Sequence, residues 1–283
     1  MTSPRTLLNA WNLLARKELG QNFLTEPSLA AQIVALAGIG NDEVVLEIGA
    51  GLGALTIAAA RQARRTIAVE KDSHLAPLLR AELMVNGLDQ VEVREQNIFT
   101  LDLPQLAAEV GQPLTVIGNL PYNISSQILV KLIQERHAVR RAVLMFQKEL
   151  ADRLCAGPGN RTYGRLSVML QYCADLRPLR TVRPEMFFPK PKVASVVLTI
   201  DFKTTIDPVV GDETLLARVV QAAFGQRRKT LRNALAGGLL SLDSDSALQV
   251  LEAARIDPRR RAETLTVAEF VTLADVVGRF FAP

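Results

Sequence analysis

The segment Gly118-Asn119-Leu120-Pro121-Tyr122 combines residue types that could act on a nucleobase. The exocyclic amine of adenine is a poor nucleophile because its lone pair is delocalised into the ring, so its hydrogens need acceptors. The side-chain carbonyl of Asn119 and the backbone carbonyl of Leu120 would supply two. Pro121 fixes the turn through its restricted φ, and the ring of Tyr122 could stack on a flipped base. These four residues therefore suit methyl transfer to an exocyclic amine and are the candidate catalytic set.

A second motif, Glu47-Ile-Gly-Ala-Gly-Leu-Gly53, comes directly after an expected strand over residues 44–48. Glycines at such a turn let a ligand approach the backbone closely. Glu70 ends the next expected strand, where an acidic side chain can accept hydrogen bonds from both hydroxyls of a ribose. The spacing differs from the dinucleotide fingerprint G-x-G-x-x-G and resembles the loop of S-adenosylmethionine-dependent methyltransferases, which tolerates a nearby carboxylate because its ligand has no pyrophosphate. The motif favours S-adenosylmethionine over NAD as the cofactor.

Basic residues are concentrated toward the C-terminal part of the chain. The whole sequence carries a net charge of only +4, yet between Arg177 and Arg261 there are 15 Lys/Arg and 9 Asp/Glu. Two clusters in this stretch would bind RNA phosphates, and such binding should weaken steeply with salt. The candidate RNA-binding residues are Arg227, Arg228, Lys229, Arg232, Arg259, Arg260 and Arg261.

These motifs require an α/β scaffold. Short apolar segments at 44–48, 66–70, 91–93, 114–117 and 142–146 alternate with helical patterns, which is typical of βαβ units and a parallel sheet with helices on both faces. A late strand is expected over 193–200. After residue 206 only helical periodicity is found, at 215–224, 231–240, 247–254 and 267–280. We therefore expect a Rossmann-like methyltransferase domain over 1–206 and a small all-helical RNA-binding domain over 207–283.

Several other classes of protein are excluded or disfavoured by composition. The sequence has two cysteines and two histidines without metal-ligand spacing, so neither a disulfide framework nor a metal site is expected. No apolar run approaches the length needed to cross a membrane, and the N-terminus lacks the order of a secretory signal. We expect a cytoplasmic protein that binds no membrane.

The sequence resembles the ribosomal RNA small-subunit adenine N6,N6-dimethyltransferase family, of the KsgA type, over nearly its whole length. The glycine loop alone is shared with many methyltransferases, whereas the Gly-Gln-Asn-Phe-Leu and Asn-Leu-Pro-Tyr segments together are highly specific. The segments that carry the resemblance are 16–24, 47–56, 69–72, 118–125, 163–168, 187–193 and 224–231.

The resemblance implies roles for individual residues. Asn22 and Leu24 would cover the methionine end of S-adenosylmethionine, while Gly49, Gly51 and Glu70 would hold its backbone and ribose. Asn119 would bridge the cofactor and the target amine.

Two further positions bear on this resemblance. In the family an aspartate receives the cofactor's adenine amine where this chain has Asn97, so we expect a retained site with weaker binding. Phe187 would supply a second stacking face, which would hold a flipped adenine against Tyr122.

The implied substrate is a pair of adjacent adenosines in the 3′-terminal hairpin of small-subunit ribosomal RNA. Each would receive two methyl groups, on an immature ribosomal subunit, from a protein that acts as a monomer and releases S-adenosylhomocysteine. Alternatives are a resistance-type methyltransferase of large-subunit RNA and a non-catalytic RNA-binding assembly factor on the same fold. An NAD oxidoreductase is disfavoured because the fingerprint spacing and an evident proton donor are missing.

Overall fold

The computed structural model describes residues 2–281, apart from the side chain of Lys17. Contacts between Cα atoms divide it into two compact units. The first unit comprises Met1–Ala151 and Asp175–Phe202, and the second comprises Asp152–Ala174 and Lys203–Pro283.

The first unit is built around a seven-stranded sheet in the order β4-β3-β2-β5-β6-β9-β7. Pairing is parallel from β4 to β6, whereas β9 runs antiparallel to β6. The register places Glu47 of β2 between Ala68 of β3 and Ile117 of β5. The strands are β2 (Val44–Ile48), β3 (Arg65–Glu70), β4 (Glu92–Glu95), β5 (Leu114–Asn119), β6 (Val139–Gln147), β7 (Ala174–Val182) and β9 (Ser195–Phe202).

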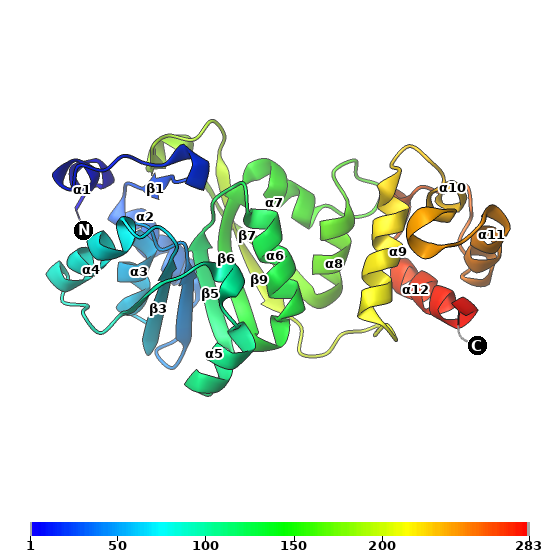
Figure 1. The fold of residues 1–283 in the computed structure, drawn as a ribbon, viewed down its shortest axis with the longest axis horizontal. Coiled ribbons are helices and arrows are strands. Elements are labelled where there is room, and N and C mark those ends of the chain that lie inside the picture. Colours follow the sequence, from blue (N-terminus) through cyan, green and yellow to red (C-terminus); the bar gives the residue numbers. More distant parts are fainter. Residues whose placement is uncertain (1, 282–283) are drawn as a thin grey trace. The chain divides into compact units, whose positions relative to one another are not determined.

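Helices cover both faces of this sheet. The connections β2-α3-β3 and β5-α6-β6 run in opposite directions along it, so right-handed crossovers place α3 and α6 on opposite faces (Figure 1). Because helices lie on both faces, consecutive residues of β5 and β6 are buried. The helices between strands are α3 (Ala54–Ala60), α4 (Leu75–Val85), α5 (Leu103–Val110), α6 (Ser125–Gln134) and α7 (Lys148–Cys155), with short 3-10 turns η2 (Ile98–Thr100) and η3 (Arg136–Ala138). The predicted α/β class is confirmed.

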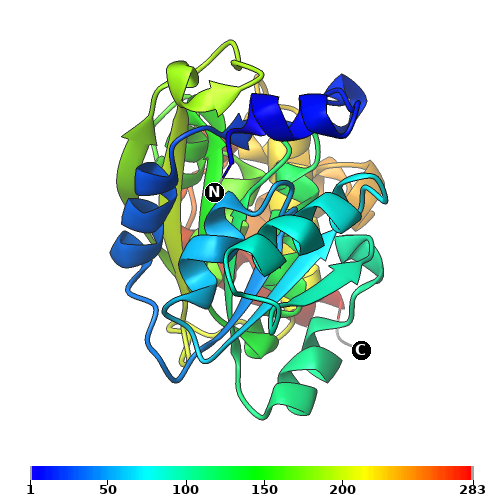
Figure 2. The same cartoon turned by 90° about the vertical axis from the view of Figure 1, so that its left-hand side faces the viewer.

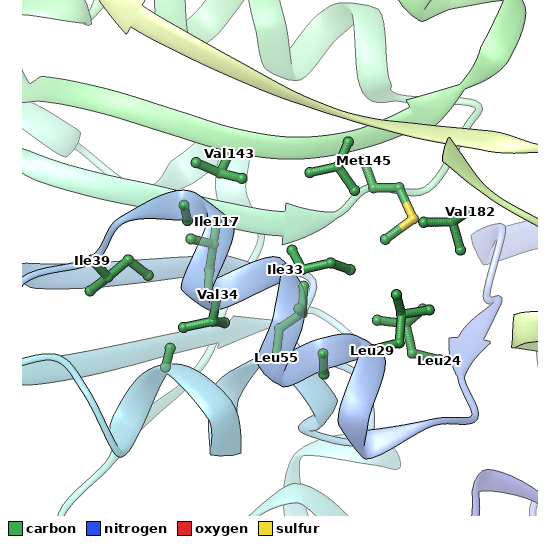
Figure 3. Close-up of a cluster of buried hydrophobic side chains, with 14 of the residues drawn as sticks. Leu24, Leu29, Ile33, Val34, Ile39, Leu55, Ile117, Val143, Met145 and Val182 are labelled. Carbon is green, nitrogen blue, oxygen red and sulfur yellow. The ribbon is translucent and has the colours of Figure 1, made fainter. Parts of the chain in front are cut away.

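One face of the sheet is sealed by α2 (Pro27–Ala37), which begins with a proline in its first turn and ends at Gly38 in the left-handed conformation. Its apolar side chains pack with Leu55 of α3 on residues that β5, β6 and β7 direct to the same face (Figure 3). This cluster fixes the strand ends that carry the polar motifs. Its labelled members are Leu24, Leu29, Ile33, Val34, Ile39, Leu55, Ile117, Val143, Met145 and Val182.

The N-terminal arm is folded onto the first unit. Helix α1 (Pro4–Ala10) buries Leu7 and Leu8 against α4 and against the loop that precedes α3. In Figure 2, α1 lies above α4. After the turn η1 (Lys17–Leu19), strand β1 (Phe23–Leu24) pairs antiparallel with β8 (Phe187–Phe188), which follows the turn η4 (Pro184–Met186). The arm thereby reaches the edge of the sheet where the motifs lie.

The second unit is helical. It contains α8 (Arg165–Cys173), α9 (Glu213–Gly225), α10 (Leu231–Leu235), α11 (Ser244–Ala253) and α12 (Val267–Phe281), with turns η5 (Gly238–Leu240) and η6 (Ala262–Thr264). The ring of Phe224 lies between Tyr163 and Phe270, at centroid distances of 6.1 and 5.8 Å. The helix expected over 231–240 stops at Leu235 because Gly237 and Gly238 both have positive φ.

The contact-based division lies near the expected boundary, with one difference. The chain changes unit after Phe202, close to residue 206, but residues 152–174 also group with the helical unit. The reason is that α8 packs against α9 and α12. None of the helices among residues 2–281 is long and apolar enough to cross a membrane.

Candidate functional site

A cavity of about 230 Å³ opens at the carboxyl ends of β2, β3 and β5. This is the edge where open α/β sheets place their ligands. Residues of the N-terminal arm close it from the other side. All seven predicted cofactor-binding residues line it: Asn22, Leu24, Gly49, Gly51, Glu70, Asn97 and Asn119.

The glycine loop follows the geometry that its sequence predicts. Gly49 has a φ of +72° and donates from its backbone nitrogen to the Val69 carbonyl at 2.9 Å, so the loop is tied to the end of β3. Gly53 precedes α3 in the left-handed conformation, and a Cβ there would stand 2.6 Å from Leu79 Cδ1. Glycine is therefore favoured at the positive-φ positions of the turn, and the backbone of Gly49 and Gly51 lines the cavity without a side chain in front of it.

Two buried carboxylates lie on the cavity wall. Glu70 accepts hydrogen bonds from the backbone nitrogens of Gly51 and Asp72, both at 2.8 Å. Burial raises the pKa of Glu70, although these two bonds oppose the rise. Glu47 is 2% exposed and accepts a hydrogen bond from the Thr56 hydroxyl, and burial raises its pKa to about 8. The oxygen atoms of Glu70 can accept hydrogen bonds from hydroxyl donors, and a carboxyl group at this position disfavours a pyrophosphate.

Asn97 reaches the same edge through strand register. Glu70 pairs with Glu95 across β3 and β4, so Asn97 follows two residues beyond the paired position. Its Oδ1 accepts from the backbone nitrogen of Phe99 at 3.2 Å, which caps the turn η2. The amide is thus held at the cavity wall, and a carbonyl oxygen has a second lone pair for a ligand amine.

Residues 16–22, which we call the N-terminal strap, are attached to the end of β3 through Asp72. Gln21 Nε2 donates to Asp72 Oδ2 at 2.8 Å, and Arg16 Nη1 lies 3.6 Å from Asp72 Oδ1. Burial alone would raise the pKa of Asp72, but hydrogen bonds from His74 and Gln21 and the charge of Arg16 hold it below its ordinary value. The roles of Gln21 and Asp72 were not predicted, although both lie inside segments that carry the family resemblance.

Asn119 is oriented by the strap. Its Nδ2 donates to the backbone carbonyl of Asn22 at 2.6 Å, which leaves Oδ1 as an acceptor on the other side of the amide. Gly118 precedes it because a Cβ there would lie 2.7 Å from the Ile48 carbonyl oxygen. Asn119 and Pro121 line the cavity, whereas the side chain of Leu120 is buried. The candidate acceptor at Leu120 is its backbone carbonyl.

The two predicted stacking residues lie in different surroundings. The half-buried Tyr122 hydroxyl is 2.9 Å from the hydroxyl of the buried Ser195, and burial raises the pKa of the phenol. This contact anchors the ring and was not predicted. Phe187 is 3% exposed and packs into the cluster of Figure 3, so it offers no open face for a base in this conformation. Its stacking role stays a prediction that requires the ring to move.

The two predicted cationic clusters belong to one surface of the second unit. Leu231 donates from its backbone nitrogen to the Arg260 carbonyl at 2.7 Å, and Arg232 donates to the Pro258 carbonyl at 3.2 Å. A third segment joins them, because Arg227 donates to the carbonyl of Arg161. Arg161 is exposed and was not among the predicted residues.

Only part of this cationic surface is compensated by acidic side chains. Arg260 pairs with Glu269, Arg259 with Asp257 and Arg232 with Asp245. In contrast, the side chains of Arg228, Lys229 and Arg261 form no hydrogen bond or ion pair within residues 2–281. These three side chains are therefore the cations most available to an anionic partner.

No group of three or more His, Cys, Asp and Glu residues with the arrangement of a metal site is found in the part of the chain that the structure describes.

The family described as "Ribosomal RNA adenine dimethylase" matches residues 12–277. A relative from Desulforapulum autotrophicum, "Ribosomal RNA small subunit methyltransferase A", is 52% identical over 278 residues, which cover 98% of this chain and 97% of the relative.

Two solved structures resemble the chain. A dimethyladenosine transferase from Plasmodium falciparum aligns with a TM-score of 0.77 and 26% identity, over 89% of this chain and 95% of that one. The 23S rRNA methyltransferase ErmE aligns with a TM-score of 0.68 and 23% identity, over 90% and 99% respectively, which shows a shared fold.

Proposed function

The chain belongs to the ribosomal RNA adenine dimethylase family, and we propose that it transfers methyl groups from S-adenosylmethionine to N6 of two adjacent adenosines in the 3′-terminal hairpin of small-subunit ribosomal RNA. The observation that carries this proposal is the placement of Asn119 and Pro121 on the cavity that holds every predicted cofactor residue. The relative named for the small subunit, similar over nearly the whole chain, supports the choice of RNA.

The residues that line the cavity suit the chemistry of the cofactor. When bound, S-adenosylmethionine supplies an electrophilic methyl group on a positively charged sulfur. Glu70 would accept hydrogen bonds from the ribose hydroxyls, and Asn97 would accept one from the adenine amine. Gly49 and Gly51 would let the backbone approach the ligand, and Asn22 and Leu24 would cover its methionine end.

The catalytic loop would activate and align the target amine. For the first transfer, Oδ1 of Asn119 and the carbonyl of Leu120 would each accept one N6 hydrogen, which withdraws the nitrogen lone pair from conjugation with the ring and makes it available to the methyl group. Tyr122 would stack on the flipped base, and its electron-rich face suits the positive charge that develops on N6. The methylated nitrogen is a strong acid and passes its proton to water, so no general base is required. The rate gain would come mainly from alignment.

The cationic surface of the second unit would bind RNA phosphates. Its predicted members are Arg227, Arg228, Lys229, Arg232, Arg259, Arg260 and Arg261, of which Arg228, Lys229 and Arg261 would contribute most because they form no ion pair within residues 2–281. We propose that the protein acts in the cytoplasm as a monomer, and that its substrate is an immature ribosomal subunit.

Labelling of ribosomal subunits tests this function. The protein is incubated with labelled S-adenosylmethionine and either immature small or immature large subunits, and methylated bases are then mapped. We expect label only in small-subunit RNA, at two adjacent adenosines. Label confined to large-subunit RNA would replace the substrate with that of a resistance-type enzyme. No label in either, with cofactor binding intact, would indicate a non-catalytic assembly factor.

A further inference from the structure

The two edge strands of the sheet carry very different charge patterns. At the β4 edge, Glu92 pairs with both Arg65 and Arg94 at 2.6 Å, and Arg94 lies 3.8 Å from Glu109. Strand β7 begins with the exposed Asp175, but from Arg177 to the end of the loop that follows β8 every exposed charged side chain except Glu185 is positive. We call these side chains the β7–β8 basic strip: Arg177, Arg180, Arg183, Lys190 and Lys192.

Few acidic groups compensate the strip. Glu185 is the one acidic residue between Arg177 and Lys192, and it pairs with Lys190 at 2.5 Å. Glu26 shares a groove with Arg180 and Arg183. Arg180 is held by Gln32, to which its Nη1 donates at 2.6 Å, an interaction that leaves its charge uncompensated. The side chains of Arg177 and Lys192 form no hydrogen bond or ion pair within residues 2–281.

Protection of an edge strand does not explain this pattern. Charged side chains and proline on an edge prevent pairing with other sheets, and β7 already contains Pro178. Charges of either sign would serve that purpose, as the β4 edge demonstrates. All the charged side chains between Arg177 and Arg183 are positive, over about 20 Å of extended chain. Such a row of positive charges is instead complementary to a polyanion.

The strip also leads toward the site. From β7 the chain passes through η4 into β8, which pairs with β1, and Leu24 of β1 lines the cavity. We infer that the β7–β8 basic strip binds the phosphate backbone of the RNA substrate and is a contact surface of the first unit itself. This inference rests on the proposed function, because it takes the RNA of that reaction as the partner.

Binding of a labelled RNA hairpin with two adjacent loop adenosines tests the inference on the full chain. The strip variant carries Arg177→Gln, Arg180→Gln and Arg183→Gln, and the control carries Arg61→Gln, Arg64→Gln and Arg80→Gln, three exposed arginines elsewhere on the same unit. We expect the strip variant to bind about tenfold more weakly at low salt. The plot of the log of the binding constant against the log of the salt concentration should become shallower, with a slope smaller in magnitude by about 2, as expected when about three phosphate contacts are lost. Lysine at the same three positions should restore most of the slope.

Two controls keep the outcomes separate. Calorimetry with S-adenosylmethionine should give the same affinity for wild type and the strip variant, which shows that the unit is folded. An unchanged slope in the strip variant, or an equal loss in the control variant, would overturn the inference. If wild type methylates small-subunit RNA while the strip variant binds normally, the inference fails and the proposed function stands. If wild type methylates no RNA, the proposed function itself fails.

Discussion

The cavity of the first unit and the cationic surface of the second hold their ionisable side chains in opposite ways. In the cavity, Glu47 and Glu70 are nearly inaccessible and each accepts specific hydrogen bonds. On the cationic surface, side chains such as Arg228 and Lys229 are exposed and form no ion pair within residues 2–281. Water can replace a lost partner on the surface but not in the cavity.

This contrast predicts two kinds of response to mutation. A change in the cavity should have a large effect from a single residue, independent of salt, because buried polar groups lose partners that nothing replaces. A change on the surface should have a small effect that depends on salt and adds with its neighbours. The predictions below test that division, from the largest expected effect to the smallest.

Asn119→Ala should lower kcat by about 10²–10³-fold, the scale seen when one well-placed polar group is removed from an active site. The alanine loses the acceptor that orients N6, while the rest of the cavity remains. Single-turnover methylation measures the rate, and calorimetry should show that cofactor affinity changes far less. A fall in affinity that accounted for the whole loss of rate would contradict a role in aligning the amine.

Glu70→Gln should weaken S-adenosylmethionine binding by about 10–100-fold, because hydrogen bonds to a charged acceptor contribute about 1.5–3 kcal/mol. The amide would also set an NH2 group against one of the backbone donors of Gly51 and Asp72. Calorimetry at two salt concentrations measures the effect, which should be the same at both. Glu92→Gln, an edge-strand control with exposed partners, should leave binding unchanged.

Glu47→Gln should change how stability depends on pH. Burial raises the pKa of Glu47 from 4.5 to about 8. Between these values the unfolded chain has lost its proton and the folded chain keeps it, so the free energy of unfolding falls as pH rises from about 5 to about 8. In denaturation experiments on the cofactor-free protein, the free energy of unfolding of wild type should fall by about 3–4 kcal/mol more than that of the variant over this range. Parallel profiles would mean that Glu47 is ionised throughout.

Asn97→Asp should tighten S-adenosylmethionine binding by about 2–10-fold, because a charged acceptor forms a stronger hydrogen bond than an amide carbonyl. The carboxylate can still accept from the Phe99 backbone, so the turn η2 is kept. Calorimetry above pH 6 measures the change. Equal affinities would show that Asn97 already serves the ligand as well as an aspartate would.

Arg228→Gln should reduce RNA affinity by only about two- to threefold near physiological salt. The slope of the log of the binding constant against the log of the salt concentration should become smaller in magnitude by about 1, as for the loss of one phosphate contact. Binding titrations over several salt concentrations measure both numbers. Combining it with Lys229→Gln should add the two effects. If Arg228→Gln alone reduced RNA affinity more than tenfold, the expectation that surface changes have small effects would be wrong.

The sequence was sufficient to predict what depends on local pattern. The strands that carry Glu47, Glu70 and Asn119 are continuous apolar segments, and their motifs come at strand ends, so parallel pairing had to bring them to one edge. Strand β7 was missed because its polar residues and Pro178 lack the apolar pattern of a strand buried on both faces. Helix α1 was missed because it depends on tertiary contacts of Leu7 and Leu8.

Contacts between distant segments could not be predicted in the same way. Nothing in the local pattern shows that Tyr122 meets Ser195, or that Gln21 meets Asp72. The burial of Phe187 was equally hidden, because an aromatic residue beside prolines suits both a core and a binding face. Each of these depends on how loops from different parts of the chain meet above the sheet.

The hydrogen bond from Asn119 to the carbonyl of Asn22 couples the orientation of this amide to the position of the strap. The strap forms part of the cavity wall, so a ligand cannot be exchanged through that side unless the strap moves. Any such movement releases the amide of Asn119. If the spent donor leaves through that side, its exchange is coupled to the alignment of the acceptor, and each successive transfer to one nitrogen would begin after the hydrogen bond between Asn119 and Asn22 has formed again.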